Sequence, residues 1–421
     1  MRRRTLLKGL LAAAIGAPGF RLPLVNAAGH RGKLFVFVQA DGGWDPTSFC
    51  DPKANTPGEP VINHWAQYDD VHQAGNIPYA PFANNAAFFN KYYPHMLVIN
   101  GVDAQTNSHS TGIVHNWSGR NSEGYPTLSA LLAAYYAPAL PIPYLSFGGF
   151  SATSGIARFT RIDNASLLRD IAYPVVAEDM VSDADWATLE RYRAEAAERL
   201  AATPNLLPGD ERHLDFYQSA FTAKGLKAYA DALPPDDQLE DWEEGPNDFG
   251  SDLRHQAQLT VLAFKTGVAV SADLILGGFD THDNHDENHE WLLGALTRGV
   301  DYLWEYAEAH GVADRLVVVI GSDFGRTNFY NSQSGKDHWP IGSYVVMEKN
   351  QPWTNRVAGE TDELHFAYRI DPRTLRRNDT GGTIIYPKHV HKALRRYLGV
   401  EHSAGALRFP FNNTEDFAFF G

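Results

Sequence analysis

The chain alternates between short, almost wholly apolar runs and longer segments with the spacing of amphipathic helices. Helical spacing occurs in Thr127–Tyr136, Leu253–Val270 and Trp291–His310, and the last of these ends at Gly311, a typical helix stop. Because strands alternate with helices, we predict an α/β fold with a doubly wound, mostly parallel sheet and helices on both faces. Six runs rich in β-branched residues are typical of its buried strands: Lys33–Gln39, Met96–Val102, Pro143–Gly148, Ala272–Gly277, Arg315–Ile320 and Tyr344–Met347.

The middle of the chain has a different composition. Residues Asp185–Leu233 are rich in Ala, Glu and Arg, which predicts two helices, and the acidic loop Pro234–Asp248 follows them. We interpret residues 170–247 as a helical insertion that caps the sheet, so that residues 29–421 form a single domain. Asp51–Pro94 is rich in Asn, Pro and aromatic residues and has little periodicity. We expect it to be an ordered, irregular loop near the functional site.

The first residues have the pattern of an export signal. A basic run at Arg2–Arg4 precedes the apolar stretch Gly9–Ala17, and Val25–Ala27 gives a small-residue cleavage pattern. The apolar stretch is shorter than the ~20 residues that a membrane-spanning helix needs. We therefore predict that residues 1–28 are a removable signal and that the protein is not membrane-spanning.

The arginine pair in this signal, followed by Thr5, two leucines and Lys8, closely resembles the twin-arginine motif. The alternative is an ordinary secretion signal with extra arginines. The twin-arginine interpretation implies that the translocase of that pathway is a partner during export, and that the protein is periplasmic or otherwise exported. Substrates of this pathway cross the membrane folded, often with a cofactor loaded, which favours a bound metal.

Charge and cysteine content narrow the class of protein. Residues 1–28 contain five basic and no acidic residues, so their removal takes Lys plus Arg from 36 to 31 against 50 acids, a net charge of −19. This charge argues against a nucleic-acid or anionic-membrane partner, because both need a basic face. Cys50 is the only cysteine, so the fold cannot rest on an internal disulfide.

Residues that could carry chemistry follow four of the predicted strands. Ligands of α/β sheets bind beyond the carboxyl ends of the strands, so these side chains are expected at one edge. The candidates are Asp41 and Asp45 after the first strand, Ser108 and His109 after the second, Asp280, His282 and His285 after the fourth, and Asp323, Arg326, Asp337 and His338 after the fifth.

The mixture of carboxylates and imidazoles points to a divalent metal. Such a mixture suits Zn²⁺, Mn²⁺ or Fe, whereas sites made only of oxygen suit Mg²⁺ or Ca²⁺. Asp280 and His282 are two residues apart, so an extended segment would direct both to the same side. Any single Asp after a strand is more often a helix N-cap, as we expect for Asp283 and Asp286. A metal is favoured because candidate ligands follow four different strands and not only one.

The C-terminal half resembles a known family. Gly278–His282, a helix, a hydrophobic strand, Ser322–Thr327 and Gly335–His338 follow the signature of the exported family known as domain of unknown function 1501. Earlier elements, including Asp51–Lys53, match it more weakly. This family looks like a distant branch of the alkaline phosphatase and sulfatase superfamily, which implies an alkaline phosphatase-like fold.

The resemblance implies a two-metal site. Asp41, with Asp45 as the alternative, would match the superfamily's N-terminal Asp, and Asp280 with His282 or His285 would match its Asp-plus-His element. Asp323 would begin the superfamily's Asp-His pair, but Phe324 stands in place of the His. His338 would replace that His or serve the other metal. Asp337 would be a ligand or would orient His338.

The nucleophile is less well defined by this resemblance. The superfamily has a Ser, Thr or modified Cys after the second strand, where this chain offers Ser108, Ser110 and Thr111, with His109 among them. These hydroxyls are equally typical of helix caps. Arg326 would bind a phosphate or sulfate oxygen pair; its alternative is a surface ion pair.

Two functions are consistent with these residues. The first is a periplasmic, metal-dependent hydrolase of phosphate or sulfate esters, with divalent ions such as Zn²⁺, Mn²⁺ or Ca²⁺ and a small anionic ester as substrate. The alternative is a non-catalytic exported protein on the same fold, which binds metal and a surface polymer or partner protein. Phe324 and the ill-defined nucleophile favour the alternative, and a fold by itself does not decide between them.

Overall fold

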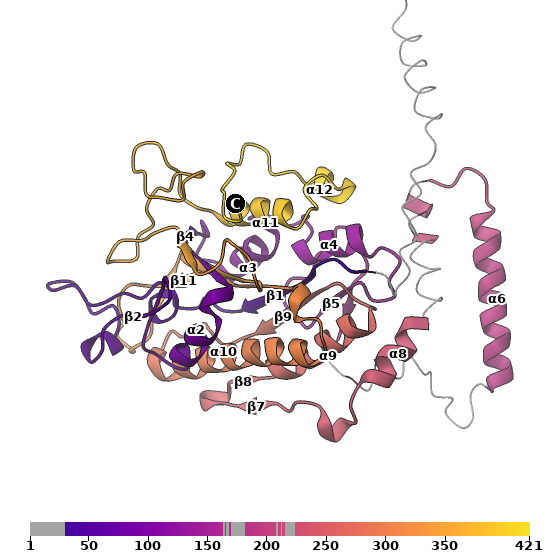
Figure 1. The fold of residues 1–421 in the computed structure, drawn as a ribbon, viewed down its shortest axis with the longest axis horizontal. Coiled ribbons are helices and arrows are strands. Elements are labelled where there is room, and N and C mark those ends of the chain that lie inside the picture. The colour runs from indigo at the N-terminus through magenta and orange to yellow at the C-terminus, as the bar shows by residue number, and fades with distance from the viewer. Residues whose placement is uncertain are drawn as a thin grey trace, which may run out of the picture.

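An eight-stranded sheet forms the centre of the molecule (Figure 1). The computed structural model describes residues 30–421 apart from residues 163–164, 166–167, 170–181, 208, 212 and 215–223, so the predicted signal at residues 1–28 lies outside the described residues. The strands, in their order across the sheet, are β14 (Arg356–Ala358), β4 (Met96–Asp103), β13 (Ile341–Met347), β10 (Leu316–Ser322), β1 (Leu34–Ala40), β9 (Ser271–Leu276), β5 (Tyr144–Ser146) and β6 (Thr160–Arg161).

The sheet is mixed but mostly parallel. β1 pairs in parallel with both β10 and β9, and the β5–β9, β5–β6 and β14–β4 pairs are parallel as well. Only β13 runs the other way, between β10 and β4. The predicted α/β class is therefore confirmed, and the sixth predicted strand is corrected to an antiparallel one. The connection from β10 to β13 contains no helix, whereas a parallel neighbour usually needs a helical crossover.

Helices cover both faces of the sheet. On one face, α2 (Asn85–Tyr92), α9 (Leu253–Thr266) and α10 (His285–Ala309) pack on the side chains of Val36 and Val38. On the other, α3 (His109–Ser118), α4 (Leu128–Tyr136) and α11 (Pro387–Tyr397) pack around Phe35 and Phe37. Both faces are buried, which explains why the strands are apolar throughout rather than alternating.

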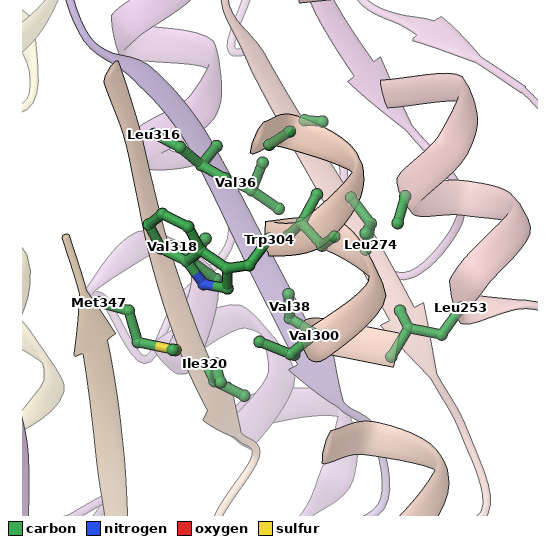
Figure 2. Close-up of a cluster of buried hydrophobic side chains, with 14 of the residues drawn as sticks. Val36, Val38, Leu253, Leu274, Val300, Trp304, Leu316, Val318, Ile320 and Met347 are labelled. Atoms are coloured by element: carbon green, nitrogen blue, oxygen red, sulfur yellow. The ribbon is translucent and has the colours of Figure 1, made fainter. Parts of the chain in front are cut away.

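Figure 2 shows the first of these two core layers at the centre of the sheet. Val36 and Val38 of β1, Val318 and Ile320 of β10 and the indole of Trp304 on α10 meet there, and all are at most 1% exposed. Burying such side chains contributes about 25 cal/mol for each Å² of apolar surface removed from water. The central strands are thereby held in a fixed register, so the loops at their carboxyl ends start from fixed points.

The predicted helices are present with shifted ends. Thr127 caps α4 by accepting a hydrogen bond from the Ala130 amide, and α9 ends at Gly267 in the left-handed region. α10 begins at His285, earlier than the predicted start at Trp291, because Asn284 at its N-cap interrupts the extended segment there.

The segment Asp51–Pro94 is more regular than predicted. It contains the hairpin of β2 (His72–Ala74) and β3 (Ile77–Tyr79), and then α2. Phe88, Phe89 and Tyr92 form the buried face of α2. The sequence pattern missed this helix because it lasts only 8 residues, too few for a clear periodicity.

The predicted insertion contains α6 (Asp183–Ala201) and α8 (Lys224–Ala232), as well as residues outside the described part. α8 packs against α9, whereas the described side chains of α6 are exposed or only half-buried. Its role as a cap therefore stays a prediction. Within the described residues, no helix is both long enough and apolar enough to cross a membrane.

Candidate metal centre

Four loops meet at the edge of the sheet where β1, β4, β9 and β10 end. Asp41 follows β1, His109 begins α3 after β4, Asp280 and His282 follow β9, and Asp323 follows β10. The loop that begins with Asp323 is the return from β10 to β13, and it brings a further histidine to the same edge.

This return loop contains a short hairpin outside the main sheet. Its strands are β11 (Gly325–Arg326) and β12 (His338–Trp339), which pair with each other. Because all the strands of the main sheet except β13 run in the same direction, the loops share one edge although they lie far apart in the sequence. Among the candidates expected at this edge, the structure brings Asp41, Asp280, His282, Asp323 and His338 together around His109.

The centre of this cluster is formed by three imidazole nitrogens and one carboxylate. His338 Nε2 lies 3.0 Å from His109 Nε2, 2.9 Å from His282 Nε2 and 3.1 Å from Asp280 Oδ1. Asp280 also lies 2.9 Å from His282 Nε2 and 3.3 Å from His109 Nε2. Ligand atoms of His109, Asp280 and His338 all lie within 4.8 Å of one another, which is the spacing of a metal site.

The other ring nitrogen of each histidine determines its tautomer. Nδ1 of His109 faces Asp323 Oδ2 at 2.7 Å, Nδ1 of His282 faces Asp337 Oδ1 at 3.0 Å, and Nδ1 of His338 faces the Asn107 carbonyl at 2.7 Å. Each of these partners only accepts hydrogen bonds, so each Nδ1 donates and each neutral ring keeps a lone pair at Nε2.

Three lone pairs and a carboxylate oxygen therefore point at one another. The lone pairs repel one another unless a proton or a metal ion lies between them, since Arg326 balances only the charge of Asp280. Nδ1 donation to a carboxylate or carbonyl is the usual support of a metal-bound histidine. The residues present fit a divalent ion held by His109, Asp280 and His338, and His282 lies beside them as a candidate fourth ligand. Without an ion, a proton on one imidazole would relieve part of this repulsion. The hydrogen bond to Asp323 favours such a proton, because it raises the pKa of His109.

Asp41 adds a further unsatisfied group beside this cluster. Its Oδ1 is buried and has no hydrogen-bond partner among the described residues. Burial, and then the neighbouring charge of Asp323, raise the pKa of Asp41 to about 6. A buried acceptor without a donor is costly, and a cation nearby would remove that cost.

Asp323 lies behind His109. Its Oδ1 accepts hydrogen bonds from Gln39 Nε2 at 3.1 Å and from the Gly42 amide at 3.0 Å, and its Oδ2 faces His109. With both oxygens engaged, Asp323 orients a ligand. Asp337 does the same for His282, whereas the resemblance implied His338 as its partner.

Asp45 and His285 are not part of this cluster. Asp45 Oδ2 lies 2.6 Å from Lys336 Nζ and 3.2 Å from His285 Nε2, and all three side chains are fully buried. Asp45 and His285 therefore belong to a separate buried group with Lys336, apart from the cluster of His109, Asp280 and His338.

Arg326 also differs from its expected place. Its side chain is fully buried, and its guanidinium donates to the carbonyls of Gly42, Gly43 and Lys336 and to Asp280 Oδ1. A guanidinium with all of its nitrogens engaged holds these loops together. It is neither exposed to an incoming anion nor in a surface ion pair.

Ser108 stands at the N-cap of α3, and its hydroxyl makes no capping hydrogen bond. It lies 3.1 Å from the Ser110 hydroxyl, and both side chains are exposed. Phe324, the residue at the position of the superfamily's His, is buried with its ring centroid 4.8 Å from those of His109 and His338. Its ring supports the two imidazoles from the side.

Three contributors to the site were not found from the sequence: Gln39, the carbonyl of Asn107 and Lys336. Gln39 is a polar residue at the end of an otherwise apolar strand, which is a usable signal. Lys336 lies within Gly335–His338, but its burial has no signature in the sequence.

Comparison with known proteins agrees with the resemblance in the sequence. Residues 182–386 match the family described as Protein of unknown function (DUF1501), which confirms the predicted resemblance to that family. No curated protein matches the chain.

Among solved structures, the chain is similar to Ps i-CgsB in complex with a neocarrahexaose, with a TM-score of 0.41 and 8% identity over 93% of this chain and 76% of that one. The putative sulfatase yidJ from Bacteroides fragilis has a TM-score of 0.39 and 9% identity over 95% and 78%. A protein in the alkaline phosphatase superfamily from Vibrio parahaemolyticus has a TM-score of 0.39 and 9% identity over 95% and 76%. Likenesses at this level assign no activity to the chain.

Proposed function

We propose that this DUF1501 protein is a metal-dependent hydrolase of phosphate or sulfate esters that holds a divalent ion through His109, Asp280, His282 and His338. The observation that carries the proposal is the convergence of three Nε2 lone pairs on the Asp280 carboxylate. Three imidazoles with one carboxylate favour Zn²⁺ or Mn²⁺ over Ca²⁺, which prefers oxygen ligands.

The side chains around the ion have separate tasks in this proposal. The ion supplies Lewis acidity and lowers the pKa of water. Asp323 and Asp337 hold His109 and His282 in orientation. Asp41 lies beside the cluster with a buried carboxylate oxygen that has no partner among the described residues, so it is placed to bind the ion or to accept a proton.

The anionic ester as substrate class rests on the sequence resemblance and on the position of α3. His109 is the first residue of this 10-residue helix, so the unpaired amides of its first turn lie next to the cluster. Helix N-termini favour anions. Asp280 is 44% exposed, which leaves the cluster accessible to a substrate.

One observation favours the alternative, a non-catalytic metal-binding protein. The Ser108 and Ser110 hydroxyls face each other, rather than one of the imidazoles of the cluster. A hydrolase without a hydroxyl nucleophile would need water for the attack. Metal binding without hydrolysis of either ester would support this alternative.

A metal analysis with matched variants tests the proposal. Purified mature protein should contain a divalent ion, hydrolyse 4-nitrophenyl phosphate or sulfate, and melt at a lower temperature after treatment with chelator. An ion present at 100 times its dissociation constant adds about 2.7 kcal/mol. His282→Ala should lose metal, hydrolysis and most of the difference in melting temperature.

His402→Ala is the matched control, because this histidine is 89% exposed and belongs to the C-terminal part of the chain. It should retain metal and hydrolysis. His289, which also follows β9, is not a suitable control because it is fully buried and accepts a hydrogen bond from the Asp45 amide. Wild-type protein that contains no metal and melts identically with and without chelator would contradict the proposal.

A further inference from the structure

Lys336 is a fully buried lysine next to the candidate metal centre. Its ammonium lies 2.6 Å from Asp45 Oδ2 and 3.1 Å from Asn63 Oδ1, and both partners are fully buried as well. Lysine is almost never buried unless it is paired, because a charge without a partner is costly in a protein interior. The ammonium thus occupies a polar cage built for a cation.

The cage is firmly attached to the body of the protein. Asp45 Oδ1 accepts hydrogen bonds from the Thr47 amide at 2.9 Å and from the Thr47 hydroxyl at 2.6 Å. The Asp45 amide donates to His289 Nε2 at 2.8 Å, and His289 lies within the long helix α10. The carboxylate that holds Lys336 is therefore fixed to both the first loop and a core helix.

The backbone of Lys336 joins the two segments that bear the ligands. Its amide donates to the Thr281 carbonyl at 3.1 Å, and Thr281 lies between Asp280 and His282. Its carbonyl accepts from Arg326 at 3.1 Å, and Asp337 and His338 follow directly. A shift of Lys336 would therefore move His338 relative to Asp280 and His282.

We infer that Lys336 is a positioning residue of the metal centre: its ammonium, held by Asp45 and Asn63, fixes the Asp337–His338 segment against the Asp280–His282 segment. The inference rests on the proposed function, since it assigns a task in metal binding. Replacing a buried ion pair with an apolar pair of similar volume is often neutral or stabilising, so the task assigned to this pair is the geometry that it imposes.

Metal affinity measured by chelator competition tests this inference in the full mature protein, with Zn²⁺ and Mn²⁺ as probes. Lys336→Met keeps the length of the side chain and removes its charge. The dissociation constant should rise about 10- to 100-fold, the usual effect of removing a group that orients a ligand. Lys33→Met is the matched control, because Lys33 pairs with the buried Glu348 at 2.9 Å and precedes β1, at the opposite edge of the sheet.

The double variant Lys336→Met with Asp45→Asn keeps the test decisive if Lys336→Met does not fold, because it leaves no unpaired charge. Weaker metal binding by the double variant, at an unchanged melting temperature of the metal-free protein, supports the inference. Binding as tight as in wild type overturns it, even if the metal-free protein melts earlier. Wild type that binds neither ion would instead overturn the proposed function.

Discussion

At the scale of single residues, Asp273 is a carboxyl buried within the central sheet. It lies on β9 and is fully buried, and it accepts hydrogen bonds from the Ser129 and Tyr144 hydroxyls. Burial, which outweighs these hydrogen bonds, raises its pKa from 3.8 to about 7. The group is therefore held in its neutral form over a range of pH in which the unfolded chain would ionise it.

This raised pKa predicts a pH-dependent stability. The native state binds the Asp273 proton more tightly than the unfolded chain does, so the contribution of Asp273 is fully present below about pH 4 and is lost as the pH rises to about 7. One pKa unit corresponds to about 1.4 kcal/mol, so the loss reaches at most about 4 kcal/mol. Asp273→Asn, which is neutral at any pH, should abolish it.

Urea unfolding at pH 5 and pH 8 measures this effect. The stability of Asp273→Asn relative to wild type should be higher at pH 8 than at pH 5. Asp41, with a pKa of about 6, also titrates in this range, but it is present in both proteins, so the difference between them isolates Asp273. If the stability difference between Asp273→Asn and wild type is the same at pH 5 and pH 8, the Asp273 carboxyl does not titrate between these two pH values.

At the scale of elements, the turn after β1 depends on a glycine. Gly42 has a φ of +114°, and a Cβ there would lie 2.5 Å from the backbone nitrogen of Asp280. Its amide donates to Asp323 Oδ1, and its carbonyl accepts from Arg326. The end of β1 can approach the loop after β9 this closely only because residue 42 has no side chain.

Gly42→Ala should therefore destabilise the protein and weaken the metal centre. Gly58→Ala is the matched control, since Gly58 also has a positive φ of +90° but open space around its Cβ position. We expect the control to cost about 1 kcal/mol of stability through backbone strain alone, and Gly42→Ala to cost about 3 kcal/mol or more. Thermal unfolding and metal content measure both effects; equal losses in the two variants would argue against the close approach.

At the scale of the whole molecule, the charge and the cysteine content suit export in the folded state. Cys50 is buried and free, so folding does not require disulfide formation in an oxidising compartment. The candidate metal centre would be loaded in the cytoplasm, before the chain meets the metals of another compartment. The predicted export signal at residues 1–28 lies outside the residues that the structure describes.

Export is predicted to need the arginine pair Arg3 and Arg4. Replacing both with lysine keeps the charge and removes the guanidinium groups that the twin-arginine pathway recognises, so unprocessed precursor should accumulate in the cytoplasm. Fractionation and detection of the precursor and mature forms measure this. Normal processing and export of the double variant would favour the ordinary secretion signal instead.

The sequence by itself determined the fold class and most of the side chains that meet at the candidate metal centre. Runs of β-branched residues form the sheet because burial on both faces requires them, and Thr127 and Gly267 set helix ends through local hydrogen bonding and backbone freedom. Asp280, His282 and His338 could be found because strand ends of a mostly parallel sheet share one edge.

Only the tertiary structure decided what each of these side chains does. Asp323 and Asp337 orient histidines, Asp45 pairs with Lys336, and Arg326 is buried among carbonyls. These tasks depend on which atoms meet, and the partners lie up to 291 positions apart in the sequence. Local patterns specify residue types and periodicity, whereas the packing of the whole chain fixes the distances and ring orientations on which ligand geometry depends.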